Sequence, residues 1–452
     1  MKTGSFPAQI LRAFVFGGVL ASTTAFLPVR PADSRTEGTG TAATLTDSPK
    51  VILDEAWQLV NQYYVDNTFN KNDWQAIRRD LLKPSYSSKD QAYSALRNAL
   101  KKLQDPYTRF MDPEQFTALT TQTSGELSGV GIRLEKNKVT KILTVVEPMA
   151  GSPALKAGIK SGDQILAIDG KTTRSMDVEA ASELIRGKVG TTVKLRINRD
   201  GTQNFDVAIG RQLIELSTVT SSIKKEGENT IGYIRLGEFS SHAASQIQKA
   251  IKELGKQQVS AYILDLRGNP GGLLNASIDI ARMWLNKGMI VRTVDRVGQD
   301  ESILANQTAI SPLPLVVLVD GNSASSSEIL TGALKDNGRA TVVGSKTFGK
   351  ALVQSVHQLS DGSGMAVTIA HYYTPNGTDI SHKGIIPDIQ TDLSAEQIAQ
   401  LNSKPELMAT KADPQYAQAV RSAAKLIRAY RPGDRPSVTI NGAETPPAQA
   451  IK

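Results

Sequence analysis

Three patterns of hydrophobic and polar positions follow one another along the chain, and each predicts a different kind of structure. From 49 to 122, apolar residues such as Ile52 and Ala56 recur every three or four positions, which predicts amphipathic helices. From 123 to 212, short apolar runs are separated by glycines, which predicts small strands with one or two helices. From 213 to 392, apolar runs of strand length alternate with helical patterns, which predicts an α/β core.

The two ends of the chain have a different character. A positively charged start precedes an apolar stretch and small residues, so residues 1–32 are expected to form a secretory signal peptide. An uncleaved single-span anchor is the alternative, because the stretch approaches the length that spans a bilayer. Residues 33–48 are expected to be a flexible linker. Residues 393–430 have a helical pattern, and residues 431–452, rich in proline and polar residues, are expected to be disordered.

The composition excludes several kinds of chemistry. The chain has 452 residues, a net charge of +8 and no cysteine. It therefore has no disulfide, no thiolate nucleophile and no cysteine-based zinc or iron–sulfur site. No basic run is interleaved with aromatic residues, so nucleic acid is not expected as a partner. The mild positive charge leaves peripheral association with an anionic membrane surface open.

One stretch of the third region combines a strand, a sharp turn and the start of a helix. The apolar run from Leu315 to Val319 is followed by the turn Asp320-Gly321-Asn322 and then by several serines. Ser325 and Ser326 lie where the helix begins, and free backbone N–H groups at a helix start stabilise an oxyanion. Ser325 is therefore the candidate nucleophile, and the N–H of Ser326 is one candidate oxyanion donor.

A second strand, turn and helix of the same layout offers another oxyanion donor. The strand from Ala261 to Leu266 is followed by Arg267-Gly268-Asn269-Pro270-Gly271-Gly272. The N–H of Gly271 or of Gly272 is the candidate, because neither is hidden by a side chain. A plain helix-entry turn is the alternative.

A serine nucleophile needs a base to take its proton. A Ser-His-Asp triad stays open, but none of the four histidines lies in a local hydrolase motif: they are His242, His357, His371 and His382. Lys350 follows Gly349 in a loop between two apolar strands. Full burial lowers the pKa of a lysine by as much as ~3–5 units, which gives a neutral amine near neutral pH.

The same loop has a superficial likeness to a phosphate-binding loop. Residues 344–350 match the first seven positions of a P-loop, but Ala351 stands where Ser or Thr would hold magnesium. The residues that follow alternate like a strand, whereas a P-loop opens a helix. We therefore expect no nucleotide, no other cofactor and no metal.

The second region resembles a PDZ domain. The residues that carry this resemblance are the loop Gly129-Val130-Gly131-Ile132 and the Gly-Asp-x-Ile-x-x-Ile-x-Gly pattern that ends at Gly170. In PDZ domains the loop N–H groups hold the C-terminal carboxylate of a peptide that adds a strand to the sheet edge. A simple hairpin connection is the alternative for the loop.

Several motifs together resemble the carboxyl-terminal processing proteases, the tail-specific serine peptidases that carry a PDZ domain and form subfamily A of peptidase family S41. The most specific are Ser323-Ala324-Ser325-Ser326-Ser327-Glu328-Ile329, Thr347-Phe348-Gly349-Lys350 and Leu266-Arg267-Gly268-Asn269-Pro270-Gly271-Gly272. The similar but less specific ones are Asp105-Pro106-Tyr107-Thr108-Arg109-Phe110 and Gly384-Ile385-Ile386-Pro387-Asp388. The likeness extends from about Val51 to Asp392 in the order expected of this family.

The resemblance implies roles for individual residues. In this family the nucleophile is the middle serine of the Ser-Ala-Ser-x-Ser-Glu run, twenty-five positions before the lysine, which selects Ser325 and Lys350. Some members have a glutamine four residues after the lysine, and Gln354 would orient the lysine amine. Ser326 replaces a commoner alanine, which leaves the backbone N–H in place. Asp336 is expected to have a structural role at a helix end.

The resemblance also implies a fold class and an activity. The fold is α+β multidomain, with a helical N-terminal region (49–122), a PDZ domain (123–212) and an α/β catalytic core of the ClpP/crotonase-like spiral type (213–392). The activity is that of a serine endopeptidase with a Ser-Lys dyad that recognises substrate C-termini through its PDZ domain. A PDZ-containing peptide-binding scaffold with weak or no peptidase activity is the alternative.

A particular substrate is implied by one branch of the family. Relatives in plants, algae and cyanobacteria trim the C-terminal extension of the photosystem II protein D1, and the segment from Asp54 to Trp74 is most similar to that branch. The D1 precursor is therefore the expected substrate. An exported protein of this kind is expected in the periplasm or the thylakoid lumen, with membrane association open.

Overall fold

The computed structural model describes residues 48–137, 139–201 and 203–430. The predicted signal peptide (1–32), all of the predicted linker except Ser48, and the predicted tail (431–452) lie outside these residues. No helix within the described ranges is long and apolar enough to cross a membrane. The chain forms two compact units: one contains the residues up to Phe116 with 295–297 and 353–370, and the other contains the rest.

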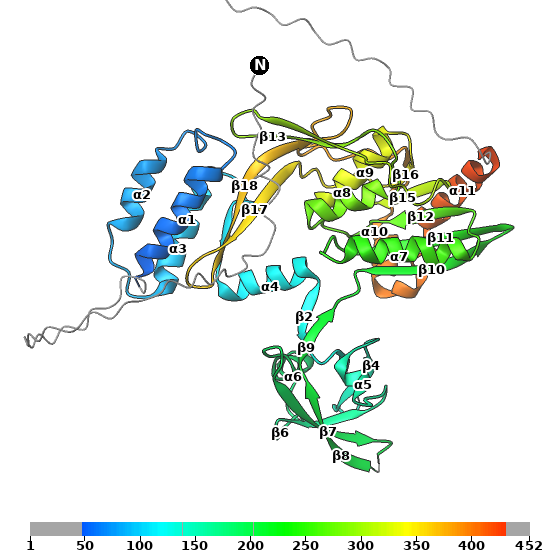
Figure 1. The fold of residues 1–452 in the computed structure, drawn as a ribbon, viewed down its shortest axis with the longest axis horizontal. Coiled ribbons are helices and arrows are strands. Elements are labelled where there is room, and N and C mark those ends of the chain that lie inside the picture. Colours follow the sequence, from blue (N-terminus) through cyan, green and yellow to red (C-terminus); the bar gives the residue numbers. More distant parts are fainter. Residues whose placement is uncertain (1–47, 138, 202, 431–452) are drawn as a thin grey trace, which may run out of the picture. The chain divides into compact units, whose positions relative to one another are not determined.

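The first unit is built around aromatic side chains. Its helices α1 (Pro49–Tyr63), α2 (Trp74–Leu82) and α3 (Lys89–Leu100) lie side by side in Figure 1. Trp57 and Trp74 stack with their ring centroids 6.5 Å apart, and Phe69 stacks on Trp74 at 5.4 Å. The indole N–H of Trp57 donates to the carbonyl of Trp74 at 2.8 Å, so the polar atom of this buried side chain has a hydrogen-bond partner within the core.

Residues 353–370 belong to this first unit, although the sequence pattern placed them in the catalytic core (213–392). Strand β18 (Gly364–Tyr373) pairs antiparallel with β1 (Arg109–Met111), and Met365 is buried among the helices of the unit. With only three residues, β1 is too short to show a strand period, so no sequence pattern indicates this pairing. The preceding strand is β17 (Leu352–Gln358), and α4 (Pro113–Ser124) leads from the first unit into the second.

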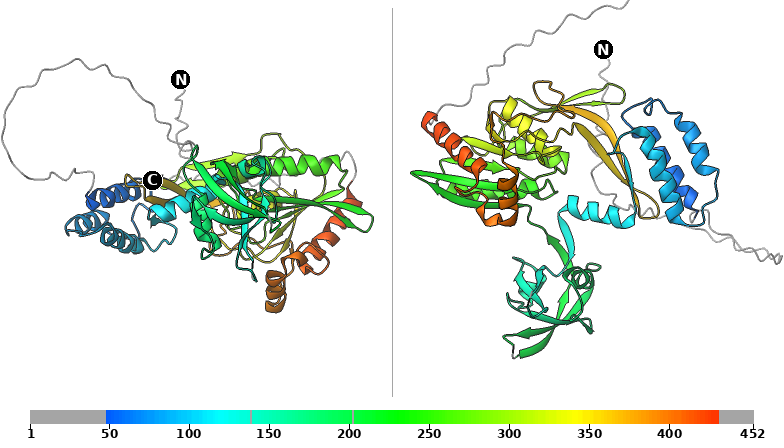
Figure 2. Two further views of the ribbon diagram at one scale, coloured as in Figure 1. Left: turned by 90° about the horizontal axis from the view of Figure 1, so that it is seen from below. Right: turned by 180° about the vertical axis from the view of Figure 1, so that it is seen from behind.

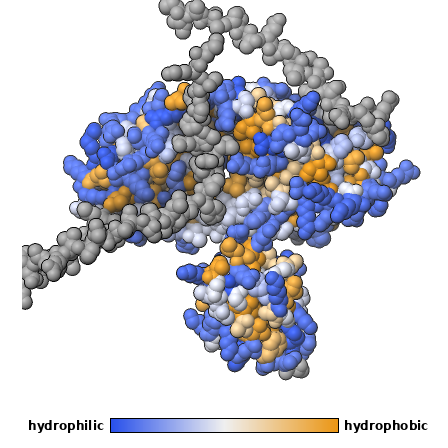
Figure 3. Space-filling view, in the orientation of Figure 1, coloured by the Kyte–Doolittle hydropathy of each residue, from blue (hydrophilic) through white to orange (hydrophobic). Residues whose placement is uncertain are grey.

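The second unit begins with a small domain of strands. Its elements are β2 (Glu126–Gly129), β3 (Ile132–Lys136), β4 (Leu143–Pro148), α5 (Pro153–Lys156), β5 (Gln164–Ile168), β6 (Lys171–Thr172), α6 (Val178–Ile185), β7 (Thr192–Arg199), β8 (Gln203–Gly210) and β9 (Gln212–Glu215). The main sheet has the order β3-β4-β5-β7-β8, which puts β3 at an edge, and β2 pairs with β9 at the two ends of the domain. Figure 3 shows hydrophobic side chains gathered on the visible face of this domain.

The remainder of the second unit contains a six-stranded sheet. Its strands, in spatial order, are β10 (Val219–Glu226), β11 (Asn229–Leu236), β12 (Ala261–Asp265), β15 (Leu315–Val319), β16 (Thr341–Gly344) and β19 (Ile389–Gln390). The β10–β11 pair is antiparallel, and the pairs that follow it are parallel. The helices are α7 (Ala243–Lys256), α8 (Leu274–Arg282), α9 (Ser326–Asp336), α10 (Ala395–Ser403) and α11 (Pro414–Ala429). Outside this six-stranded sheet, β13 (Met289–Asp295) pairs antiparallel with β14 (Asp300–Leu304).

Helices cover both faces of this sheet, as Figures 1 and 2 show. On β12, Ile263 packs in the cluster that includes Tyr416 and Ala419 of α11. Its neighbour Tyr262 faces the other way, with its ring 5.2 Å from that of Trp284 and its hydroxyl donating to the carbonyl of Ile251 of α7. All five residues of β12 are therefore buried, as expected of a parallel strand covered on both faces. The turns after β12 and β15 lie at the carboxyl edge of the sheet, where α/β folds place their sites.

The first unit contains a histidine that makes stability depend on pH. The ring of His357 stacks on Tyr63 at 5.3 Å, its Nε2 lies 2.9 Å from the Ser355 hydroxyl, and burial lowers the pKa of His357 below its ordinary value. The unfolded chain therefore binds this proton more readily, so folding stability is lost as the pH falls through about 6.5.

We therefore expect the His357→Gln variant to lose less thermal stability than wild type when the pH drops from about 7.5 to about 5.5. The exposed His382 supplies the control, since His382→Gln should retain the wild-type pH dependence of the melting temperature. Equal pH dependence in His357→Gln and wild type would contradict the assignment.

Candidate active site

Ser325 is held at the start of α9 in an unusual backbone conformation. The turn after β15 is fixed by Ser323, whose hydroxyl donates to the carbonyl of Leu266 at 2.9 Å. Ser325 then has φ 53° and ψ −114°, outside the regions that residues with a side chain commonly adopt. Such a conformation persists only where the surroundings fix it, and it is typical of functional positions.

One carboxylate joins the Ser325 turn to the Lys350 loop. Glu328 Oε2 accepts the backbone N–H of Ser325 at 3.0 Å and the backbone N–H of Lys350 at 2.9 Å. Two hydrogen bonds to one oxygen limit the separation of the two nitrogens to about 6 Å. The structure therefore brings together Ser325 and Lys350, which are distant in sequence, through a residue for which no role was predicted.

The other oxygen of Glu328 fixes the rest of the loop. Glu328 Oε1 accepts the Thr347 hydroxyl at 2.6 Å and the backbone N–H of Gly349 at 2.7 Å. The side chain is fully buried, and burial raises the pKa of Glu328 above its ordinary value, although these hydrogen bonds favour the ionised form. Since every contact is from a donor, the arrangement suits a carboxylate acting only as an acceptor.

Tyr372 adds a second link between the same two segments. Its buried hydroxyl contacts the carbonyl oxygens of both Ser325 and Lys350, the former at 3.2 Å. Tyr372 was not among the predicted site residues, and no local motif marks it. Glu328 was detectable in principle, because it lies three residues after Ser325 and so has the spacing of a capping box.

The two glycines of the first turn are not equivalent. The N–H of Gly271 already donates to the side-chain oxygen of Asn269 at 2.9 Å. In the described part of the chain, the N–H groups of Gly272 and Ser326 have no acceptor. These two groups belong to adjoining segments, because the Ser326 hydroxyl donates to the carbonyl of Gly272 at 2.9 Å.

Gly271 is required by its contact with the turn that carries Ser325. A Cβ at this position would lie 2.9 Å from the Cβ of Ser325 and 2.8 Å from the carbonyl oxygen of Ala324. Its φ of 107° also disfavours a side chain. The absence of a Cβ therefore allows the two turns to approach one another.

The remaining predicted residues of the catalytic region lie elsewhere or have structural contacts. Gln354 lies on β17, in the part of the chain that belongs to the first unit. Asp336 accepts the backbone N–H of Asn376 at 3.0 Å, at the end of α9. Within the described residues no histidine ring forms a hydrogen bond with Ser325; His242, for example, lies 3.0 Å from Glu126.

The loop predicted to bind a carboxylate precedes the edge strand of the small domain. Gly131 has φ 75°, and a Cβ there would clash with the Cβ of Ser152. The carbonyls of Val130 and Gly131 are bound to the N–H groups of Ala154 and Met149, each at 2.9 Å, whereas their own N–H groups have no acceptor among residues that the structure describes. Gly129 ends β2 and Ile132 begins β3, whose outer edge is open for an added strand.

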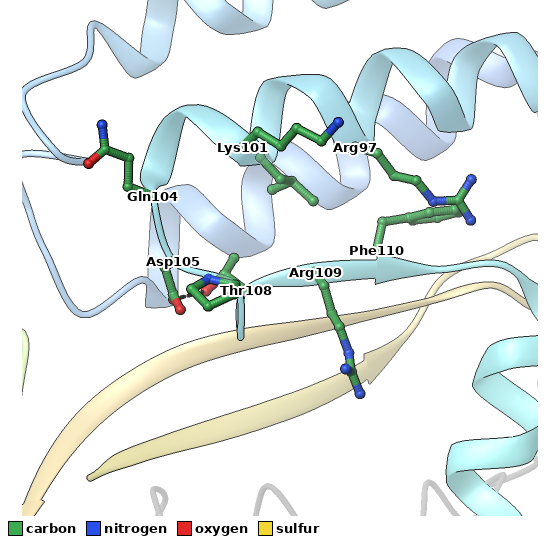
Figure 4. A pocket seen from close by; sticks show the side chains of 9 residues that line it. Arg97, Lys101, Gln104, Asp105, Thr108, Arg109 and Phe110 are labelled. Atoms are coloured by element: carbon green, nitrogen blue, oxygen red, sulfur yellow. Dashed lines mark hydrogen bonds between the residues drawn. The ribbon is translucent and has the colours of Figure 1, made fainter. Parts of the chain in front are cut away.

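The first unit has a pocket of about 490 Å³ between α3 and β1, shown in Figure 4. Arg97 is paired with Asp112 at 3.0 Å and lies over the ring of Phe110. Arg109 points away from Arg97 and Lys101 (Figure 4), because successive residues of a strand face opposite sides. The cationic groups that line the pocket therefore do not converge on one ligand. The region around Ser325 is the better candidate for an active site.

Comparison with known proteins identifies two domains of the chain. The profile of Peptidase family S41 matches residues 230–391, and that of the PDZ domain matches residues 144–199. A carboxyl-terminal-processing protease of Picosynechococcus sp. is 46% identical over 380 residues, covering 84% of this chain and 90% of the relative. One of Synechocystis sp. is 44% identical over 385 residues, covering 84% and 88%.

A solved structure agrees with these relatives. The protein named photosystem II D1 C-terminal processing protease is 35% identical, covers 82% of this chain and 99% of its own, and superposes with a TM-score of 0.51. The predicted fold class is thereby confirmed. An N-terminal helical region, a PDZ domain and an α/β core with this site define a serine-type peptidase. Within that class, the chain belongs to the carboxyl-terminal-processing proteases of family S41.

The role of the Glu328 carboxylate can be tested by its amide isostere. Glu328→Gln replaces one acceptor oxygen by an NH₂ group that faces N–H or O–H donors, so Ser325 and Lys350 are no longer held together. We expect kcat for peptide cleavage to fall about 100-fold, since small displacements of reacting groups have effects of this size. Glu253→Gln, on the exposed surface of α7, is the control and should leave kcat unchanged. Unaltered kcat in a folded Glu328→Gln variant would refute the role.

Proposed function

We propose that the protein is an endopeptidase in which Ser325 is the nucleophile and Lys350 is the general base. The observation that carries this proposal is the bifurcated contact of Glu328 Oε2 with the backbone N–H groups of both residues. This contact brings the backbone of the two residues together, as a Ser-Lys pair requires. The family relationship supports the same assignment.

The chemistry follows from the positions of these groups. The neutral amine of Lys350 takes the hydroxyl proton while Ser325 Oγ attacks the substrate carbonyl carbon. The oxyanion that forms is stabilised by the backbone N–H groups of Ser326 and Gly272, whereas the N–H of Gly271 is occupied by Asn269. The lysine returns the proton to the leaving amine, and water then hydrolyses the acyl-enzyme.

The PDZ domain selects the substrate by its free C-terminus. The unoccupied N–H groups of Val130 and Gly131 suit a carboxylate, and the open edge of β3 accepts the preceding residues as an added strand. Partly buried apolar side chains on α6 and β3, among them Leu134 and Val178, provide a site for the terminal side chain.

The D1 precursor of photosystem II is the substrate we propose. The support is the name of the solved relative, photosystem II D1 C-terminal processing protease, together with the cyanobacterial relatives. The signal pattern in residues 1–32 supports an exported enzyme of the periplasm or the thylakoid lumen. Peripheral contact with the membrane would bring the enzyme to this membrane-embedded substrate.

The dyad is tested with a protein substrate that has the C-terminal extension of D1. Ser325→Ala and Lys350→Ala should each lower kcat at least about 1,000-fold, because a nucleophile and its base act as a unit. The four single histidine-to-glutamine variants serve as matched controls and should remain active. An active Lys350→Ala enzyme, or a histidine variant as impaired as Ser325→Ala, would exclude the Ser-Lys dyad. Absence of cleavage by wild type would favour the scaffold alternative.

Recognition of the C-terminus is tested separately by amidating the substrate. An amide removes the negative charge that the loop N–H groups would bind, so KM should rise about 10-fold while kcat for the bound substrate changes little. Ser325→Ala protein should bind the free acid more tightly than the amide in a fluorescence anisotropy titration. Equal binding of the two peptides would contradict the assigned role of the loop.

A further inference from the structure

A fully enclosed group of charges connects the C-terminal helix to the turn that carries Gly271 and Gly272. Arg267, the residue just before this turn, is 4% exposed, and its partners Asp265 and Asp413 are both 0% exposed. Asp265 ends β12, whereas Asp413 is the N-cap of α11. No catalytic role was predicted for residues 393–430, for which the sequence indicates a helical region that covers the catalytic domain or joins subunits.

The guanidinium of Arg267 is held on two sides by carboxylates. Its Nη2 lies 2.6 Å from Asp265 Oδ2 and 2.8 Å from Asp413 Oδ2, and its Nη1 lies 3.0 Å from Asp413 Oδ1. Burial, the largest single effect, would raise the pKa of Asp265, but the charges of Arg267 and Arg235 and the hydrogen bonds from Arg267 and Tyr233 together outweigh it, so the pKa is lowered. Two-pronged contacts of this kind fix the plane of an arginine as well as its position.

Asp413 is itself anchored rather than mobile. It accepts the backbone N–H groups of Tyr416 and Ala409, each at 3.2 Å, and Gln415 supports the same guanidinium at 3.2 Å from Nη1. Gln415 also donates to the carbonyl of Thr391 at 2.9 Å. Helix α11 thus presents a rigid carboxylate to Arg267.

The turn that follows Arg267 is in direct contact with the nucleophile segment. The N–H of Gly268 donates to Asp320 Oδ1 at 2.9 Å. The carbonyl of Asn269 accepts the N–H of Ala324 at 3.1 Å and the hydroxyl of Ser327 at 2.9 Å, on both sides of Ser325. The orientation of Arg267 therefore bears on where the N–H of Gly272 points relative to Ser325.

We propose that Asp413 is a positioning residue for catalysis, which acts through Arg267 to set the oxyanion turn. This inference rests on the proposed roles of Ser325, Ser326 and Gly272. The C-terminal helix is then part of the catalytic machinery, although none of its residues touches substrate. Asp265 alone leaves the guanidinium held from one side, so the turn gains freedom when Asp413 loses its charge.

The expected effect separates positioning from binding. Asp413 has no contact with the PDZ loop or its groove, so KM should be preserved while kcat falls. We expect Asp413→Asn to lower kcat about 10- to 100-fold with KM within about twofold of wild type, since a weakened oxyanion donor affects the transition state. The pH at which activity is half-maximal should be unchanged, because Lys350 is untouched.

Tyr416→Phe is the matched control. It lies on the same helix, is equally buried and loses one hydrogen bond, from its hydroxyl to Glu226 Oε1 at 3.1 Å, without any contact to Arg267. The two variants should differ little in the thermal stability that they lose. Asp413→Asn should have the clearly lower kcat. Steady-state kinetics on the full chain, scaled to the folded fraction measured by circular dichroism, give both quantities.

Several outcomes decide the proposal. A kcat in Asp413→Asn equal to that in Tyr416→Phe would overturn it, and so would a rise in KM without a fall in kcat. If Asp413→Asn does not fold, Gln415→Met takes its place, because it removes the weaker hydrogen bond to Arg267 and leaves Asp413 intact. Gln415→Met should lower kcat severalfold. An unchanged kcat in Gln415→Met would also overturn the proposal. These comparisons require that the wild type cleaves the substrate and that Ser325→Ala does not. If the wild type does not cleave, the proposed function is contradicted, and not the role of Asp413.

Discussion

The site depends on one buried carboxylate that is surrounded by donors. Glu328 binds the backbone of Ser325 and Lys350 with one oxygen and the Thr347-Gly349 segment with the other. A buried carboxylate without partners would be strongly unfavourable, so folding of the loop and satisfaction of Glu328 require each other. The proposed nucleophile and the proposed base are therefore positioned by main-chain contacts, which do not depend on the rotamers of their own side chains.

A second constraint joins two turns that share no sequence continuity. β12 and β15 are neighbouring parallel strands, so their following turns leave the sheet at the same edge. The Asn269 carbonyl binds the segment on either side of Ser325, and Gly271 allows the close approach because it has no Cβ. The proposed nucleophile thus comes from one strand-turn-helix unit and a proposed oxyanion donor from the other.

Features that depend on neighbouring residues in the chain could be predicted from the sequence. The strand, turn and helix start around Ser325, the α/β alternation and the glycine-rich turn are all local. The fold class, which the resemblance to the family implied, is confirmed. The reason for proposing Gly272 rather than Gly271 as an oxyanion donor was not local, because it depends on the side chain of Asn269. Tyr372 and Asp413 contribute through tertiary contacts from distant segments, and β1 is too short for its pairing to be visible.

The likeness of residues 344–350 to a P-loop has a physical explanation. In both loops glycines expose backbone N–H groups to an anion, but here the anion belongs to the protein: the N–H groups of Gly349 and Lys350 bind Glu328. Gly349 has φ 93°, and a Cβ there would lie 2.8 Å from the backbone nitrogen of Gly384. A glycine at position 349 therefore allows the two backbone segments to pack closely. The Glu328 carboxylate therefore occupies N–H groups of the kind that hold phosphate in a P-loop. The lysine that would bind phosphate in a nucleotide-binding loop is instead held beside a serine.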